Sequence, residues 1–125
     1  MKELIIEKTD TTPAIAFNAS TGELKISGRA YSNDMNRFFV DLYSWVDEYL
    51  EQPQKNTSII LQLEYYNSSF YKLLFVLIVK CKKVLAQKKH LSIKWRHQKG
   101  VTDSHEEAAE ISAIVDFPIE FVEYE

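Results

Sequence analysis

Two stretches near the start of the chain have the apolar and polar pattern of strands. The segments are ELIIEKT, residues 3–9, which contains a short apolar run, and PAIAFNASTGELKISG, residues 13–28, in which apolar and polar residues alternate after the glycine. The second stretch is interrupted at residues 20–22, where Gly22 can take the positive φ that a tight turn requires. The pattern therefore predicts one strand followed by a β-hairpin.

Helical spacing follows the hairpin and continues as far as Pro53, which ends the pattern. Ser32, Asn33 or Asp34 is suited to cap this first helix, because a short polar side chain can accept a hydrogen bond from the free N–H groups of a helix start. One face of the helix is predicted to pack on a sheet. The apolar residues of that face are Phe38, Leu42, Trp45, Val46, Tyr49 and Leu50.

Strand and helix patterns alternate in the rest of the chain. TSIILQLEYY, residues 57–66, and HLSIKWRH, residues 90–97, are rich in strand formers, and the apolar run between them predicts a second helix at residues 69–87. This order implies a parallel crossover. A short acidic helix at residues 103–114 and an edge strand in FPIEFVEYE, residues 117–125, complete the pattern. The large residues expected in the core are Phe38, Trp45, Phe75 and Trp95.

Composition limits the architecture and the kinds of partner. The 125 residues, of which 46% are hydrophobic, can bury one core and show no internal repeat, so residues 1–125 are predicted to form a single domain. The fold class is α/β, a small mixed β-sheet with an N-terminal hairpin and helices packed on it. Fifteen basic against eighteen acidic residues give a net charge of -3, which argues against binding to nucleic acid.

Three further features favour a cytoplasmic protein without membrane insertion. The longest apolar run, residues 73–79, is far shorter than the ~18 residues that suggest a transmembrane helix. The apolar run near the N-terminus is too short for a secretory signal. Cys81 is the only cysteine, so no disulfide can form within the chain.

Asn67, Ser68 and Ser69 stand where a predicted central strand meets the most apolar helix. Ligands of open α/β sheets bind at the carboxyl ends of strands, and a helix N-terminus offers free N–H groups and a positive partial charge. The position therefore favours an anion. The simpler interpretation is that Ser68 or Ser69 only caps the helix, a contribution of about 1 kcal/mol.

The sequence offers little support for catalysis or metal binding. The stretch NSSFY, residues 67–71, lacks the flanking glycines of a nucleophile elbow. The potential metal ligands match no standard spacing: His97, Asp103, His105 and Glu106. The acidic residues of the predicted helix are interpreted as a solvated face: Glu106, Glu107 and Glu110. We therefore expect a protein that is not an enzyme, with no catalytic residue, no metal and no cofactor.

Five segments of the chain carry a resemblance to a known family: TPAIAF, GELKISGRAYSND, RFFVDLYSWVDEYL, LEYYNSSFYKLL and IKWRH. Together they resemble the SiaC family of bacterial regulatory phosphoproteins. The resemblance implies a fold similar to that of anti-anti-sigma factors, which is STAS-like. It also implies that Ser68 is the phosphoacceptor, with Asn67, Ser69 and Lys72 beside it. The positions that match the family pattern in order are Thr12, Pro13, Ile15, Phe17, Gly22, Leu24, Ile26, Gly28, Arg29, Tyr31, Asn67, Ser69 and Lys72.

The family's mode of action suggests what this chain does. Its members are non-enzymatic switches that a partner kinase phosphorylates and a PP2C-like phosphatase resets, and the unphosphorylated form binds and activates a diguanylate cyclase that makes cyclic di-GMP, a regulator of biofilms. The same helix N-terminus is also compatible with an alternative, a small-ligand or anion-binding α/β domain.

This chain departs from the family pattern beside the acceptor. Serine stands at Ser68 where the family has threonine, which keeps an acceptor hydroxyl. Phe70 and Tyr71 replace two small serines, and we expect them to enlarge the surface there. The residues expected to contact a partner are Arg29, Tyr31, Phe70 and Tyr71.

Overall fold

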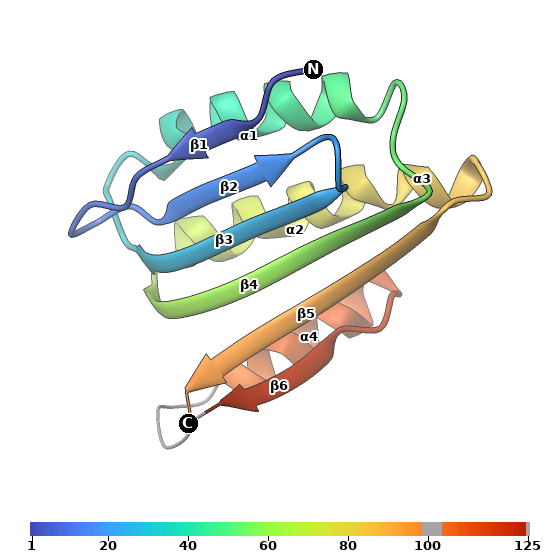
Figure 1. The fold of residues 1–125 in the computed structure, drawn as a ribbon. Helices are drawn as coiled ribbons and strands as arrows, with labels where there is room; N and C mark the ends of the chain where they lie inside the picture. Colours follow the sequence, from blue (N-terminus) through green and yellow to red (C-terminus); the bar gives the residue numbers. More distant parts are fainter. Residues whose placement is uncertain (99–103, 125) are drawn as a thin grey trace.

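Six strands form one mixed sheet in the computed structural model, which describes residues 1–98 and 104–124 (Figure 1). The strands lie in the sheet in the order in which they occur in the chain. The first three pair antiparallel, and from the third strand onward all neighbours are parallel. The predicted hairpin, parallel crossover and final edge strand are therefore confirmed. The strands are β1 (Leu4–Ile6), β2 (Ala14–Asn18), β3 (Glu23–Ala30), β4 (Asn56–Tyr66), β5 (His90–Gln98) and β6 (Glu120–Tyr124).

The three longer helices all cover the same face of the sheet, behind it in the view of Figure 1. Each connects two parallel strands, as expected for crossovers that bury one face of a sheet. In the described part of the chain, no helix is long and apolar enough to span a membrane. The helices are α1 (Met35–Tyr49), α2 (Ser68–Cys81), the short α3 (Lys83–Ala86) and α4 (Ser104–Val115).

Local structure changes the predicted element ends at several places. The first strand stops at Ile6, because the hydroxyl of Thr9 accepts hydrogen bonds from the N–H groups of Thr11 and Thr12 and turns the chain. The helix predicted at residues 69–87 is divided at Lys82 into α2 and α3, although Lys82 keeps right-handed helical angles. The predicted start of the acidic helix, Asp103, lies outside the described residues.

The core lies between the helices and the inward face of the sheet. Trp45 and Trp95 are buried as predicted, whereas Phe38 and Phe75 are only partly buried and pack on the border of the core. The adjacent positions Phe39 and Leu74 are completely buried instead. A helix turns by about 100° per residue, so the two residues of each of these pairs point in different directions, and only one of each pair lies fully in the core.

Two glycines lie near the two ends of β3 and shape the backbone there. Gly22 has a φ of 77°, as the turn prediction requires, and a Cβ there would lie 2.3 Å from the carbonyl oxygen of Asn56. The register of β3 against β4 shifts between Gly28 and Arg29, and Gly28 has a φ of 107°. After this shift Ala30 lies opposite Tyr66, the last residue of β4. The bulge therefore lies beside the junction between β4 and α2.

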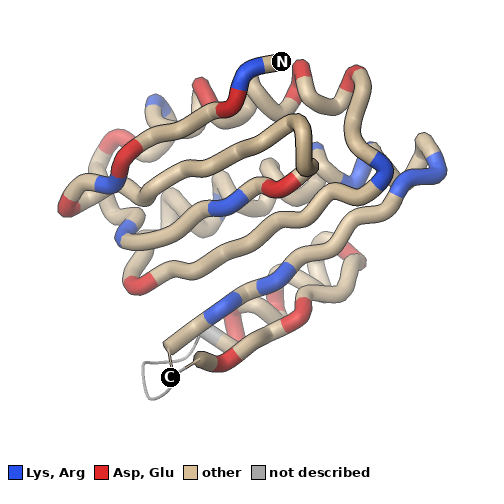
Figure 2. The backbone as a smooth tube through the Cα atoms, in the orientation of Figure 1, with Lys and Arg blue, Asp and Glu red and all other residues tan. Residues whose placement is uncertain are grey.

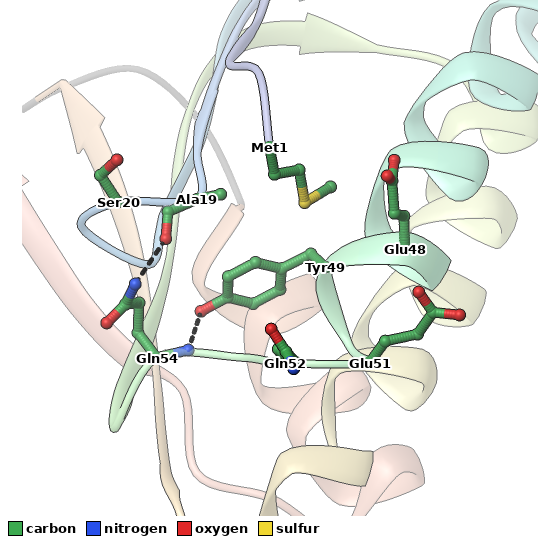
Figure 3. A pocket seen from close by; sticks show the side chains of 8 residues that line it. All are labelled: Met1, Ala19, Ser20, Glu48, Tyr49, Glu51, Gln52 and Gln54. Carbon is green, nitrogen blue, oxygen red and sulfur yellow. Dashed lines mark hydrogen bonds between the residues drawn. The ribbon is translucent and has the colours of Figure 1, made fainter.

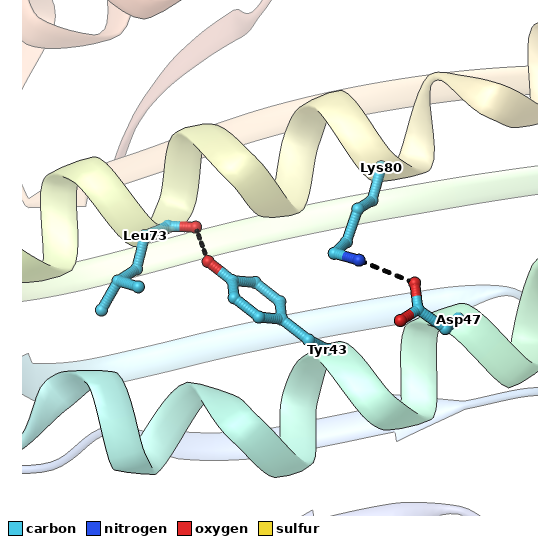
Figure 4. Close-up of polar contacts among 4 residues, drawn as sticks. All are labelled: Tyr43, Asp47, Leu73 and Lys80. Carbon is cyan, nitrogen blue, oxygen red and sulfur yellow. Dashed lines mark hydrogen bonds and ion pairs between the residues drawn. The ribbon is translucent and has the colours of Figure 1, made fainter.

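Polar contacts join α1 to α2 along their length (Figure 4). The hydroxyl of Tyr43 donates to the carbonyl oxygen of Leu73 at 2.6 Å, and the ammonium of Lys80 lies 2.8 Å from the carboxylate of Asp47. Lys80 also lies 5.3 Å from the centre of the Tyr43 ring. Burial raises the pKa of Tyr43 to about 12. These contacts hold α2 in position behind the sheet.

Candidate functional site

Asn67 is the N-cap of α2. Its side-chain oxygen accepts a hydrogen bond from the N–H of Phe70 at 2.9 Å, and its side-chain amide donates to the carbonyl oxygen of Ser32 at 3.2 Å. Its own N–H donates to the carbonyl oxygen of Ala30 at 3.0 Å. The interpretation that Ser68 or Ser69 caps the helix is therefore wrong, because Asn67 already satisfies this role.

Ser68 is the first residue of α2 and its side chain is exposed. Neither Ser68 nor Ser69, which is also exposed, makes a side-chain hydrogen bond in the described structure. The first turn of α2 contains no acidic residue, and the exposed Lys72 follows Ser68 by one helical turn. Free N–H groups, the positive end of the helix dipole and this lysine all favour negative charge at Ser68.

Phe70 does not contribute to the surface. Its side chain is completely buried, with ring-centre distances of 5.6 Å to Phe39 and 5.9 Å to Tyr66. The expectation that Phe70 enlarges the surface beside the acceptor and contacts a partner is therefore wrong for this structure. The reason is its position: two residues after Ser68, a helical residue points toward the sheet when Ser68 points away from it.

Tyr71 is half-buried and faces α4. Its hydroxyl donates to the carboxylate of Glu110 at 2.6 Å, and its ring is stacked at 8° on the ring of Tyr66. Tyr66 donates in turn to Glu107 at 2.6 Å. Burial, the hydrogen bond to Glu110 and the charges of Glu110 and Glu107 raise the pKa of Tyr71 well above its ordinary value. These carboxylates are thus partners of the tyrosines, not merely the solvated face expected from the sequence.

Arg29 and Tyr31 lie at the same end of the sheet as Asn67. Arg29 is exposed and pairs with Tyr65 across β3 and β4. Tyr31 is half-buried and meets the ring of Tyr65 edge-on at 5.2 Å. The side chain of Tyr65 is 60% exposed, and sequence reasoning missed this residue. Its position beyond the alternating apolar residues of β4 is the signal that could have found it.

Two cavities lie at the two ends of α1. One, of about 370 Å³, lies beside the cap and is lined by Thr11, Tyr31, Ser32, Asn33 and Asp34. The other, of about 490 Å³, lies at the C-terminal end of α1, where Tyr49 accepts a hydrogen bond from the N–H of Gln54 and the carboxylates of Glu48 and Glu51 line the space (Figure 3). Neither lining includes a lysine or an arginine, so neither cavity favours an anionic ligand.

Within the described residues, His97 and His105 do not assemble a metal site with Glu106. His97 and His105 both pack against the ring of Phe121, and Nε2 of His97 lies 3.4 Å from Glu123. Within residues 1–98 and 104–124, no group of three or more potential ligands could hold a metal ion. Asp103 lies outside the described residues.

Comparison with known proteins agrees with this geometry. The structure superposes with a TM-score of 0.84 on apo-SiaC from Pseudomonas aeruginosa, at 25% identity over 98% of this chain and 99% of that chain. It superposes with a TM-score of 0.88 on a chain of the complex of the diguanylate cyclase SiaD with its activator SiaC from the same bacterium, at 24% identity over 97% of this chain and 99% of that chain.

Sequence comparison gives a similar result. An uncharacterised protein of Pseudomonas aeruginosa strain UCBPP-PA14 is 25% identical over 118 residues, which is 94% of this chain and 94% of that protein. The model of the SiaC family regulatory phosphoproteins matches residues 6–124. Because this match covers nearly the whole chain, the protein belongs to the SiaC family of regulatory phosphoproteins.

Proposed function

We propose that this protein is a non-enzymatic signalling switch that is reversibly phosphorylated at Ser68. In its unphosphorylated form it binds and activates a diguanylate cyclase, as SiaC is the activator of SiaD. A partner kinase adds the phosphate and a PP2C-like phosphatase removes it. The observation that carries the proposal is an exposed serine at the start of α2 in a member of a family of regulatory phosphoproteins.

The local structure supports Ser68 as a phosphoacceptor. Its hydroxyl is accessible to a kinase because Asn67 already satisfies the cap. A phosphate adds about -1.5 to -2 charges at neutral pH, and the N-terminus of α2 stabilises such charge. We therefore expect the fold to tolerate a phosphate on Ser68.

Control of partner binding then follows from charge and shape. A phosphate at an interface must lose its hydration, and this costs free energy unless the partner offers a matching cation. Arg29 and Tyr31, together with the exposed Tyr65, lie at the same end of the sheet and provide the arginine and tyrosine side chains that are enriched in binding hot spots. We therefore expect phosphorylation to weaken binding to the cyclase.

The alternative of an anion-binding domain receives less support. The helix N-terminus attracts an anion, but the cavity beside it is lined by the carboxylate of Asp34 and by no cation. A phosphate attached to Ser68 needs no such cavity, because its covalent bond holds it at the helix N-terminus.

The decisive experiment combines labelling with binding. The protein is incubated with its cognate kinase and ATP, and phosphopeptides are mapped in the natural protein and in Ser68→Ala and Ser69→Ala variants. We expect label on Ser68, none in Ser68→Ala, and normal labelling of Ser69→Ala. Circular dichroism and affinity for the full-length cyclase are then compared between the phosphorylated and unmodified forms.

We expect unchanged circular dichroism and weaker binding after phosphorylation. Ser68→Ala should keep the affinity, and Ser68→Asp should reduce it in part, because one carboxylate imitates phosphate incompletely. Label on Ser69 alone, or equal affinity of the two forms for the cyclase, would contradict the proposal.

A further inference from the structure

Strand β6 is an outer edge of the sheet, and its backbone is open to a further strand. It is the last strand in the sheet order and pairs with β5 on one side. A strand at a sheet edge presents a row of N–H and C=O groups without partners. No backbone hydrogen bond in the described part of the chain joins residues 120–124 to a loop or a helix. With five residues, β6 is also longer than the opposite edge strand β1, which has three.

A groove of about 330 Å³ lies between α4 and β6. In Figure 1, α4 lies behind β5 and β6. The side of the groove that α4 provides includes the exposed Ala109 and Ala113, and the side that the sheet provides includes Ile119 and Phe121. Because alanine side chains are small, they leave room above the helix for apolar groups of another segment.

The side chains of a seventh strand would point into this groove. Phe121 lies opposite Trp95 of β5, which is completely buried, so Phe121 faces the helix side of the sheet. Every second side chain of a strand beside β6 would face the same side, because side chains alternate along a strand. The groove is separate from the contacts between α4 and α2, since Glu107 and Glu110, which make those contacts, do not line it.

The charges around the groove are acidic. Residues 104–124 contain no lysine or arginine. Glu106 and Asp116, near the two ends of α4, are exposed and form no ion pair or side-chain hydrogen bond within the described residues. Glu120 lies 3.7 Å from Lys94 of β5, and Figure 2 shows the acidic positions of β6 beside the basic positions of β5. A partner that approaches the free edge of β6 therefore meets mainly negative charge.

We propose that β6 and this groove bind an extended segment of a partner protein, which adds a seventh strand to the sheet. Apolar residues at every second position of the segment enter the groove, and its lysines or arginines meet Glu106, Asp116 and Glu120. Main-chain hydrogen bonds supply affinity in this mode of binding, and the alternating pockets and charges supply specificity. The inference goes beyond the proposed function and does not depend on Ser68.

A second copy of this chain is a poorer occupant. Two copies related by twofold symmetry would pair β6 with β6, and the contact would be the same surface on both. Each strand would then add the carboxylates of Glu120 and Glu123 to an edge that is already acidic, and like charges across paired strands are destabilising. Charge therefore favours a basic segment of another protein.

Synthetic peptides with blocked ends test the occupant. The peptide Lys-Val-Arg-Val-Thr-Val-Lys has alternating valines, Lys-Arg-Val-Val-Val-Thr-Lys has the same composition without alternation, and Glu-Val-Glu-Val-Thr-Val-Glu has alternation with reversed charge. Affinity for the full chain is measured by calorimetry. We expect the first peptide to bind at least about tenfold more tightly than either of the others. Equal binding of all three, or no binding of the first, would overturn the proposal.

A matched pair of variants tests the location. Ala109→Arg fills the groove and adds a positive charge, whereas Ala86→Arg makes the same change at an exposed alanine of α3. Arginine is a good helix former, and circular dichroism checks that both variants fold. We expect Ala109→Arg to bind the first peptide at least about tenfold more weakly and Ala86→Arg to change its affinity by less than about twofold. Equal effects of the two substitutions would overturn the location.

Methylated peptides test strand addition itself. N-methyl groups on alternate amides of the first peptide remove the hydrogen-bond donors along one edge of the added strand, and a second peptide carries them on the other amides. We expect one of the two to lose binding and the other to keep it. Equal affinity of both would overturn strand addition. Dimerisation of the natural protein in sedimentation experiments, lost in Ala109→Arg, would assign the surface to a second copy and overturn the proposed occupant.

Discussion

The hydroxyl of Tyr71 donates a 2.6 Å hydrogen bond to the carboxylate of Glu110 and thereby connects the first turn of α2 to α4. The two residues are 39 positions apart in the chain. Together with the bond from Tyr66 to Glu107, this contact ties α4 to the residues on both sides of Ser68.

Removing the Tyr71 hydroxyl should weaken this connection. We expect Tyr71→Phe to lower the free energy of unfolding by about 0.5 to 1 kcal/mol, because hydrogen bonds near the surface contribute modestly. Urea denaturation of Tyr71→Phe, Glu110→Gln and the double variant would measure the coupling. Strictly additive effects of the two substitutions would show that the contact contributes nothing in solution.

The cap and the acceptor should respond differently to substitution. Asn67→Ala removes the side-chain oxygen that accepts from Phe70 and should cost about 1 kcal/mol of stability, whereas Asn67→Asp should keep the cap. Ser68→Ala should change stability by less than about 0.5 kcal/mol, because the hydroxyl has no partner to lose. Thermal unfolding decides between these outcomes. A larger loss of stability in Ser68→Ala than in Asn67→Ala would contradict the assignment of Asn67 as the cap.

Stability should fall at high pH through Tyr43. Its pKa is raised from 10.0 to about 12 in the folded protein by burial. Between these values the unfolded chain releases the phenolic proton while the folded chain keeps it, so the folded state loses relative stability as the pH rises from about 10 to about 12, and the contribution is complete below pH 10. In the Tyr43→Phe variant, the free energy of unfolding should fall less over this pH range. Denaturation measured at several pH values would show the difference.

A buried thiol contributes to the same measurement. Burial also raises the pKa of the Cys81 thiol to about 12, so Cys81 contributes a fall of the same sign that begins at lower pH. An identical pH profile for Tyr43→Phe and the natural protein would argue against the raised pKa.

Gly22→Ala should be strongly destabilising. Its φ of 77° is strained for alanine, and the new Cβ would lie 2.3 Å from the carbonyl oxygen of Asn56, so the backbone must shift. Gly28→Ala is the matched control, because φ is also positive there but the nearest atom to the Cβ is 3.9 Å away. We expect a loss of about 2 to 4 kcal/mol at Gly22 and about half of that at Gly28, measured by urea denaturation.

Local sequence determined the elements of this protein. Alternating residues predicted the strands, the helical period predicted α1 and α2, and Gly22 predicted the hairpin turn, because each signal depends on a few neighbouring residues. The strand and helix order also determined the parallel crossover from β4 to β5, since a helix between two strands of one sheet allows few connections. These features could be predicted without knowing which distant residues meet.

Tertiary structure alone decided how the candidate site is built. Asn67, rather than either serine, caps α2, and its backbone and side chain also donate to Ala30 and Ser32, which the pairing of β3 with β4 brings beside it. The helical period places Phe70 on the inward side of α2, but only packing decides that its ring meets Phe39 and Tyr66 there. The pairing of Tyr71 with Glu110 depends on where α4 packs, which no local pattern encodes. Side-chain partners are set by the meeting of segments that are far apart in the chain, and only packing in three dimensions selects them.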